Sequence, residues 1–287
     1  MWKGLHGKTK NIKTIERTQK IILYILLTIM AIAVITPFYW MIASSFKPEG
    51  EITSPNPKVL PSQIVLENYF SLFTSTFFVR WLGNSLIVSC SITVIGLFFC
   101  SLGGFGFAKY RFAGRDPLFL VILGSATIPL MVTIVPVFAW AAKLHLLNTY
   151  FILIFPFTAN AFGLFFMRQY ISSIPDEIID SCRIDGCSEF RIYWQMILPV
   201  IKPALGALSI MLFLSAWGSY LWPLIMTMSN EMFTLQVGLA TMYGSMHKVE
   251  YGVLMGGATI ATLPVLILFL SAQRQFIAGL TYGATKG

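Results

Sequence analysis

The sequence predicts an all-α integral membrane protein with six transmembrane helices. Of its 287 residues, 56% are hydrophobic and only 11% are charged, whereas roughly a quarter of the residues in a soluble domain carry charge. The apolar residues form unbroken uncharged runs, and a helix of about 20 such residues crosses a hydrocarbon core of roughly 30 Å. Strands of membrane barrels alternate in polarity, so unbroken runs indicate helices. The six runs lie at residues 21–43, 85–108, 117–142, 150–167, 204–228 and 251–272.

The distribution of Lys and Arg predicts the orientation of these spans. Fifteen of them lie in the N-terminal tail, the second and fourth connections and the C-terminal tail, against five in the other three connections. Because the basic side of a membrane protein stays in the cytoplasm, we expect both termini to be cytoplasmic. The same rule accounts for the net charge of +8, so we expect no nucleic-acid partner.

The N-terminal part divides into a tail, a span and a long outward connection. Residues 1–20 form a basic cytoplasmic tail, and the apolar run after it is too long for a cleaved signal peptide, so residues 21–43 are expected to stay as a membrane anchor. The connection at residues 44–84 begins with a proline-rich half. Its second half, residues 66–82, is aromatic and sparsely charged, which predicts an interfacial helix or, alternatively, a contact for an external partner.

The residues of catalysis and ligand chemistry form no recognisable constellation. The chain has no G-x-x-x-x-G-K-[ST] motif, none of the six runs holds a charged residue, and its three His and four Cys are scattered. We therefore expect no nucleotide, cofactor or metal on this chain, no enzymatic activity and no ion coupling. Energy for any pumping must come from another chain.

The fourth connection, residues 168–203, is expected to form two short cytoplasmic helices. Pro175, followed by two acidic residues, suits the first turn of a helix, and Gly186 suits the turn that ends it. Ser188 can cap the second helix, which Pro199 would stop. An apolar stripe at helical spacing follows Ser188 and comprises Phe190, Tyr193, Trp194, Ile197 and Leu198. From this pattern alone, a surface hairpin on the lipid headgroups is the alternative.

The order of residues in this connection closely resembles the EAA loop of ABC importer permeases, in particular the sugar-importer permeases of the MalG type. The likeness rests on the run from Pro175 to Gly186 and on Ile197-Leu-Pro199 before a span. The family's Glu-Ala-Ala stands here as Asp180-Ser181-Cys182. The six-span layout and the ending at residues 273–287, which resembles the family's cytoplasmic tail, extend the likeness over nearly the whole chain.

The resemblance implies a permease subunit of an ATP-driven, binding-protein-dependent importer that translocates a sugar or oligosaccharide by alternating access. It implies a six-span permease domain at residues 21–272 in a bacterial or archaeal inner membrane. Its partners would be a second permease subunit of a different chain, two ATPase subunits holding ATP and Mg²⁺, an extracytoplasmic solute-binding protein and the sugar. A secondary carrier or channel independent of ATP and a membrane enzyme are the alternatives. The residues implied for ATPase docking are Asp180, Ser181, Cys182, Asp185, Gly186, Phe190 and Pro199.

Four residues in the spans are candidates for the substrate path. Asn160 lies near the middle of the fourth span, where its amide needs either an interhelical hydrogen bond or a substrate hydroxyl. Trp217, Tyr220 and Trp222 lie toward the outer end of the fifth span. Their rings can stack on a sugar or anchor the helix at the membrane interface.

Overall fold

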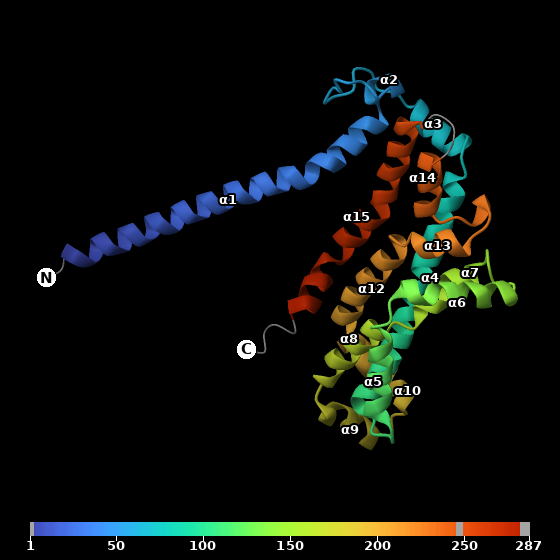
Figure 1. Cartoon of the computed structure of the whole chain (residues 1–287). Helices are drawn as coiled ribbons and strands as arrows, with labels where there is room; N and C mark the ends of the chain where they lie inside the picture. Colours follow the sequence, from blue (N-terminus) through green and yellow to red (C-terminus); the bar gives the residue numbers. More distant parts are fainter. Residues whose placement is uncertain (1–2, 245–248, 282–287) are drawn as a thin grey trace. The chain divides into compact units, whose positions relative to one another are not determined.

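The computed structural model describes residues 3–244 and 249–281, and every regular element within them is helical (Figure 1). These residues form two compact units. One comprises the chain up to Leu72 together with Glu250–Thr259, and the other comprises Phe73–Val249 and the residues from Ile260 onward.

The first unit contains the first span and the long connection after it. Helix α1 (Lys3–Ser45) continues without a break from the basic tail into the apolar run, and its segment Arg17–Ser45 is long and apolar enough to cross a membrane. The short α2 (Glu49–Ile52) and α3 (Glu67–Thr74) follow. The expected continuous interfacial helix at residues 66–82 is wrong, because α3 ends at Thr74 and the next helix begins at Phe78.

Polar side chains hold the connection of the first unit in place. The Asn68 amide donates to the carbonyls of Ser45 and Lys47, both at 2.9 Å. The Glu49 carboxylate accepts from the backbone N–H groups of Tyr251 (3.1 Å) and Gly252 (3.0 Å), at the start of α15 (Tyr251–Thr281). A carboxylate there satisfies N–H groups that have no partner inside the helix.

The second unit is built around α4 (Phe78–Lys109), against which α7 (Tyr150–Thr158), α8 (Ala161–Ser172) and α12 (Lys202–Trp217) pack. Glycine permits the close approach of α4 and α8, since a Cβ on Gly104 would lie 2.7 Å from the Met167 Cβ. The other elements are α5 (Arg115–Ser125), α6 (Leu130–Lys143), α9 (Asp176–Ile184), α10 (Glu189–Ile192), a π-helix (Tyr193–Ile197), α11 (Leu198–Val200), α13 (Leu221–Met226), a 3₁₀ turn (Asn230–Met232) and α14 (Leu235–Gly244).

Three of the six expected spans are interrupted. In the described residues, four helical segments can each cross a membrane, and the number rises to six if two bent pairs each count as one span. The third run is not one straight helix, because α5 and α6 are bent by 92° relative to each other. Pro129, directly before α6, explains the break, since proline lacks an N–H and disfavours helical backbone in the residue before it. The fourth run breaks between α7 and α8, and the fifth ends at Trp217 and resumes at Leu221.

Candidate coupling site and translocation cavity

The connection at residues 168–203 has the expected helix, turn and helix. Helix α9 starts directly after Pro175, with two acidic residues in its first turn. Gly186 has a φ of +77°, which side chains other than glycine adopt only with strain. The Ser188 hydroxyl accepts the Arg191 N–H at 3.3 Å and so caps the second helix as expected.

The second helix differs from the expectation at its end. Its turn at Tyr193–Ile197 is a π-helix, and the helix passes through Pro199 to end at Val200. The expectation that Pro199 stops the helix is wrong, because a widened turn carries the chain past a residue that cannot donate a backbone hydrogen bond. The chain then bends by 79° into α12.

The wide turn also divides the apolar stripe. Tyr193 and Ile197 are buried, together with Ile192, which was not part of the expected stripe. Phe190 and Trp194 remain 67% and 43% exposed, and their ring centroids lie 5.9 Å apart. The loop thus packs one side against its own protein and presents an aromatic pair on the other.

The residues implied for docking lie on two sides of this loop. Asp180, Ser181, Asp185, Gly186, Phe190 and Pro199 are exposed. Cys182 is not at the surface, since its side chain packs into the core with Ile179 and Met167. Asp180 faces outward next to Arg183, whose Nη1 lies 3.1 Å from its carboxylate.

Two residues at the end of α4 hold this loop, and sequence reasoning missed both roles. The Lys109 ammonium, whose side chain is 4% exposed, lies 2.6 Å from an Asp176 carboxylate oxygen and donates to the Ile174 carbonyl at 2.5 Å. The Tyr110 hydroxyl donates to the Glu189 carboxylate, which also accepts from Arg183 at 2.8 Å. In the sequence, Lys109 is only one of the fifteen basic residues that predict the orientation of the spans. Its partners lie far along the chain, so no local pattern identifies them.

The ionisation of these groups reinforces the contacts. Hydrogen bonding from Lys109 lowers the pKa of Asp176. Hydrogen bonds from Arg183, and then from Tyr110, lower the pKa of Glu189. Burial, with the hydrogen bond to the Glu189 carboxylate, raises the pKa of Tyr110 to about 12. The carboxylates are therefore charged and Tyr110 is a proton donor at neutral pH.

A small cavity lies where the interrupted spans meet. It has a volume of about 150 Å³, and Leu130, Asn160 and Ser219 on its wall each lie at or directly beside a break in a span. Interrupted membrane helices leave free backbone polar groups at such places. The remaining lining residues are Val88, Ile92, Leu153, Phe157, Leu212, Ser215, Ala216, Trp222 and Pro223.

The cavity brings together two of the four path candidates. The Asn160 side-chain oxygen caps α8 by accepting the Gly163 N–H at 2.7 Å, a local role that was not predicted from the sequence. Trp222 donates to the Ile152 carbonyl at 2.9 Å. Trp217 is buried elsewhere, donating to the Ala261 carbonyl at 3.2 Å, and Tyr220 is exposed at the break in the fifth span. Neither Trp217 nor Tyr220 is among the residues lining this cavity.

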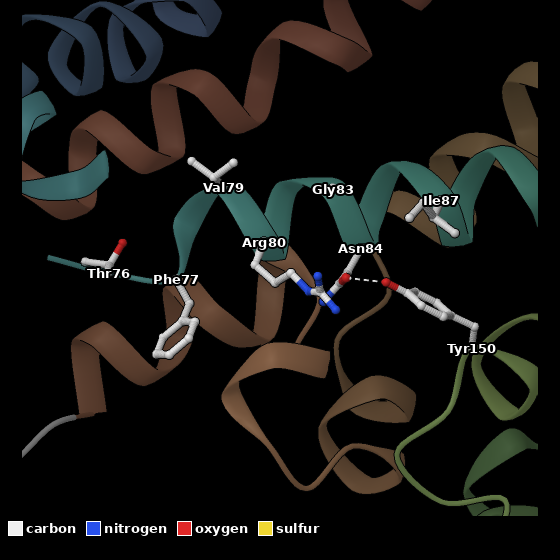
Figure 2. A pocket seen from close by; sticks show the side chains of 8 residues that line it. All are labelled: Thr76, Phe77, Val79, Arg80, Gly83, Asn84, Ile87 and Tyr150. Carbon is white, nitrogen blue, oxygen red and sulfur yellow. Dashed lines mark hydrogen bonds between the residues drawn. The ribbon is translucent and has the colours of Figure 1, made fainter. Parts of the chain in front are cut away.

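The opposite end of α4 carries a second polar cluster beside a depression of about 410 Å³, whose lining residues, Asn84 and Tyr150 among them, are drawn in Figure 2. The Asn84 amide donates to the carbonyls of Glu231 (2.7 Å) and Phe233 (2.8 Å). Its oxygen accepts from the Tyr150 hydroxyl at 2.6 Å, along the dashed line in Figure 2. Trp81 donates to the Asn230 carbonyl at 2.9 Å. These bonds fasten the loop between α13 and α14 to α4.

Comparison with known proteins gives consistent matches along the chain. Residues 92–281 match the family described as binding-protein-dependent transport system inner membrane component. The chain is 37% identical to the arabinooligosaccharides transport system permease protein AraQ of Bacillus subtilis (strain 168), over 93% of this chain and 96% of that protein. It is 38% identical to AraQ of Halalkalibacterium halodurans, over 90% and 93%. The crystal structure of a bacterial ABC transporter involved in the import of the acidic polysaccharide alginate contains a chain of the same fold, with a TM-score of 0.80 at 22% identity, covering 91% of this chain and 97% of that one.

Proposed function

The chain belongs to the family of binding-protein-dependent transport system inner membrane components, and we propose that it carries a sugar or oligosaccharide inward as one permease subunit of an ATP-driven importer. It is a transport subunit of the inner membrane, and ATP with Mg²⁺ is used by separate ATPase subunits. The AraQ relatives, named for arabinooligosaccharides, support a carbohydrate substrate. A carrier or channel independent of ATP does not fit this family.

The exposed helix, turn and helix at one end of α4 is the observation that carries the coupling role. We assign residues 168–203, residues 1–20 and residues 273–287 to the cytoplasm, in line with the positive-inside rule. Residues 1–2 and 282–287 lie outside the described residues. Asp180, Ser181, Asp185 and Phe190 would contact the ATPase subunit, with Gly186 and Pro199 shaping the surface. Cys182 would support that surface from the core side.

The cavity at the breaks supports transport by alternating access. Helices interrupted around a common point can change direction there without disturbing the packed segments on either side. Asn160 offers an amide whose N–H₂ can meet a sugar hydroxyl while its oxygen caps α8. Trp222 offers an aromatic wall for a sugar ring. The cavity has a volume of about 150 Å³, and we assign the rest of the path to the second permease subunit, a different chain.

The test is ATP hydrolysis by the assembled importer in lipid nanodiscs. This chain is purified with its second permease and two ATPase subunits, and the rate is measured with and without the sugar-loaded binding protein. Arabinooligosaccharides, lactose and maltodextrins, the sugars for which related permeases are named, are compared as ligands. We expect stimulation by a loaded binding protein, with uptake of the same sugar in proteoliposomes. A complex that shows no stimulation with any loaded binding protein would contradict the proposal.

A further inference from the structure

Helix α4 holds a polar cluster at each of its ends. At its last residue and the one after it, Lys109 and Tyr110 form hydrogen bonds to both short helices of residues 168–203, which are called the coupling loop from here on. Ser101 shares a hydrogen bond of 2.6 Å with the Tyr193 hydroxyl. Near its first residues, Asn84 and Trp81 bond to the loop between α13 and α14. Lys109 lies 25 positions after Asn84 in the same continuous helix, which corresponds to about 38 Å.

We propose that α4 couples these two loops mechanically, with Lys109 and Asn84 as the positioning residues at its two ends. This inference rests on the proposed function, in which the coupling loop takes up the motion of the ATPase in the cytoplasm. The loop between α13 and α14, at the other end of α4, then lies on the external side of the membrane and is called the outer loop. A displacement of α9 would then pass to α4 through Lys109 and reach the outer loop through Asn84.

Lys109 is suited to transmitting a displacement of α9, because its ammonium forms hydrogen bonds to residues on both sides of Pro175, at the start of that helix. Its ammonium meets the Ile174 carbonyl before the proline and the Asp176 carboxylate after it. The Lys109 side chain is 4% exposed, so water has little access to its ammonium, whereas the Asp176 side chain is 73% exposed. Hydrogen bonds from a charged donor are stronger than those between neutral groups. Tyr110 holds the second helix at the same end through Glu189.

At the other end of α4, the Asn84 side chain is buried and forms hydrogen bonds only within the protein. Asn84 is 1% exposed, and both its amide donors and its oxygen are used within the protein. Its acceptors are backbone carbonyls of the outer loop, so the position of that loop depends directly on α4.

The helix between these contacts is suited to transmit a displacement. The third, fourth and fifth spans are each interrupted, whereas α4 runs for 32 residues without a break and contains no proline. Gly104 lets it pack tightly on α8. An unbroken, closely packed helix moves as a unit, while a broken one bends at its interruption.

A double-mutant cycle tests the inference in the assembled importer. Lys109→Met keeps the length of the side chain and removes its charge and donors, and Asn84→Ala removes the amide. We expect each to lower the ATPase stimulation by loaded binding protein roughly fivefold or more, the lower bound typical of coupling between distant sites. The double variant should keep the same ATPase stimulation as the more impaired of the two single variants, because both substitutions break one connection.

Independent effects would overturn the inference. Residues about 38 Å apart with no shared partner act additively in free energy, so a double variant whose loss equals the product of the single losses would show that α4 does not link them. Lys109→Arg, which keeps charge and donors, should recover most of the stimulation. Arg111→Met is the matched control, because it removes an exposed cation two residues away.

Two further readouts keep the outcome unambiguous. If Lys109→Met fails to assemble with the ATPase subunits, Tyr110→Phe replaces it in the cycle, since it deletes a single hydroxyl. Sugar uptake per ATP hydrolysed is measured alongside, and it should fall if the connection transmits motion. A wild-type complex without stimulation would instead refute the proposed function, and the inference with it.

Discussion

Gly186 makes the turn between α9 and α10 with a φ of +77° and open space around the position where a Cβ would stand. The demand on this residue is therefore one of backbone conformation, not of volume. Proline, whose ring fixes φ near −65°, cannot adopt this geometry, and alanine can do so only with strain of about 1 to 2 kcal/mol.

We predict that Gly186→Pro abolishes the stimulation of ATP hydrolysis while leaving the chain inserted in the membrane. Gly186→Ala should lower the stimulation less, because its strain is smaller. The measurement is stimulated ATPase activity in nanodiscs, with insertion checked by membrane fractionation. Gly114→Ala is the matched control, since Gly114 has a similar φ of +82° and open surroundings but precedes α5. Normal coupling in Gly186→Pro would contradict the docking role.

Glu189 gives the coupling loop a dependence on pH. Hydrogen bonds from Arg183 and Tyr110 hold its pKa below the ordinary value. A folded-state pKa below the unfolded one means that the contribution to stability is present above the unfolded pKa and is lost as the pH falls through the folded pKa. The loop is therefore held fully at neutral pH and loosens in acid.

We predict that Glu189→Gln lowers the melting temperature of the purified complex at pH 7. The fall in melting temperature from pH 7 to pH 4 should be smaller in this variant, because Gln does not titrate. The side chain of Glu189 is 46% exposed, so solvent screening limits the loss to about 1 kcal/mol or less. Melting curves at pH 7 and pH 4 measure it. Glu177→Gln, which removes an exposed carboxylate from α9, is the control. An unchanged melting temperature at pH 7 would show that Glu189 does not hold the loop.

The interruptions in the spans are the main property of this chain at the scale of its elements. Each of the three breaks touches the same cavity of about 150 Å³. Pro129 accounts for the first break through its missing N–H, and the Asn160 cap starts a new helix at the second. Gly218 ends α12 at the third. The cavity thus lies between helix ends that fall inside the apolar runs, where the lack of charged residues gives no sign of a break.

Asn160 permits a test that separates its capping role from contact with a sugar. Asn160→Ala removes the cap and should cost about 0.5 to 2 kcal/mol of stability. Asn160→Ser keeps a capping oxygen but shortens the side chain and removes the amide donors, so the melting temperature should stay near wild type while the apparent KM for sugar uptake rises. A KM unchanged in Asn160→Ser would show that Asn160 is a cap alone.

For the whole molecule, the assigned orientation places the two ends of α4 on opposite sides of the membrane. We predict that, in a variant whose four native cysteines are replaced, Glu177→Cys reacts with a membrane-impermeant maleimide only in inside-out vesicles. Met228→Cys, which is also at an exposed position, should react only in right-side-out vesicles. The opposite pattern would invert the topology and remove the basis for the coupling role.

The amino-acid sequence by itself determined the membrane class, the places of the apolar runs and the helix, turn and helix of the coupling loop. Those properties depend on run length and on short motifs such as the Ser188 cap, both of which involve neighbours along the chain. The tertiary structure decided that Cys182 faces the core and that broken helices meet at one cavity. It also decided that Lys109 pairs with a residue 67 positions away and Asn84 with one 147 positions away. Partners so distant are chosen by the packing of α4 against α8 and α12, which no local pattern encodes.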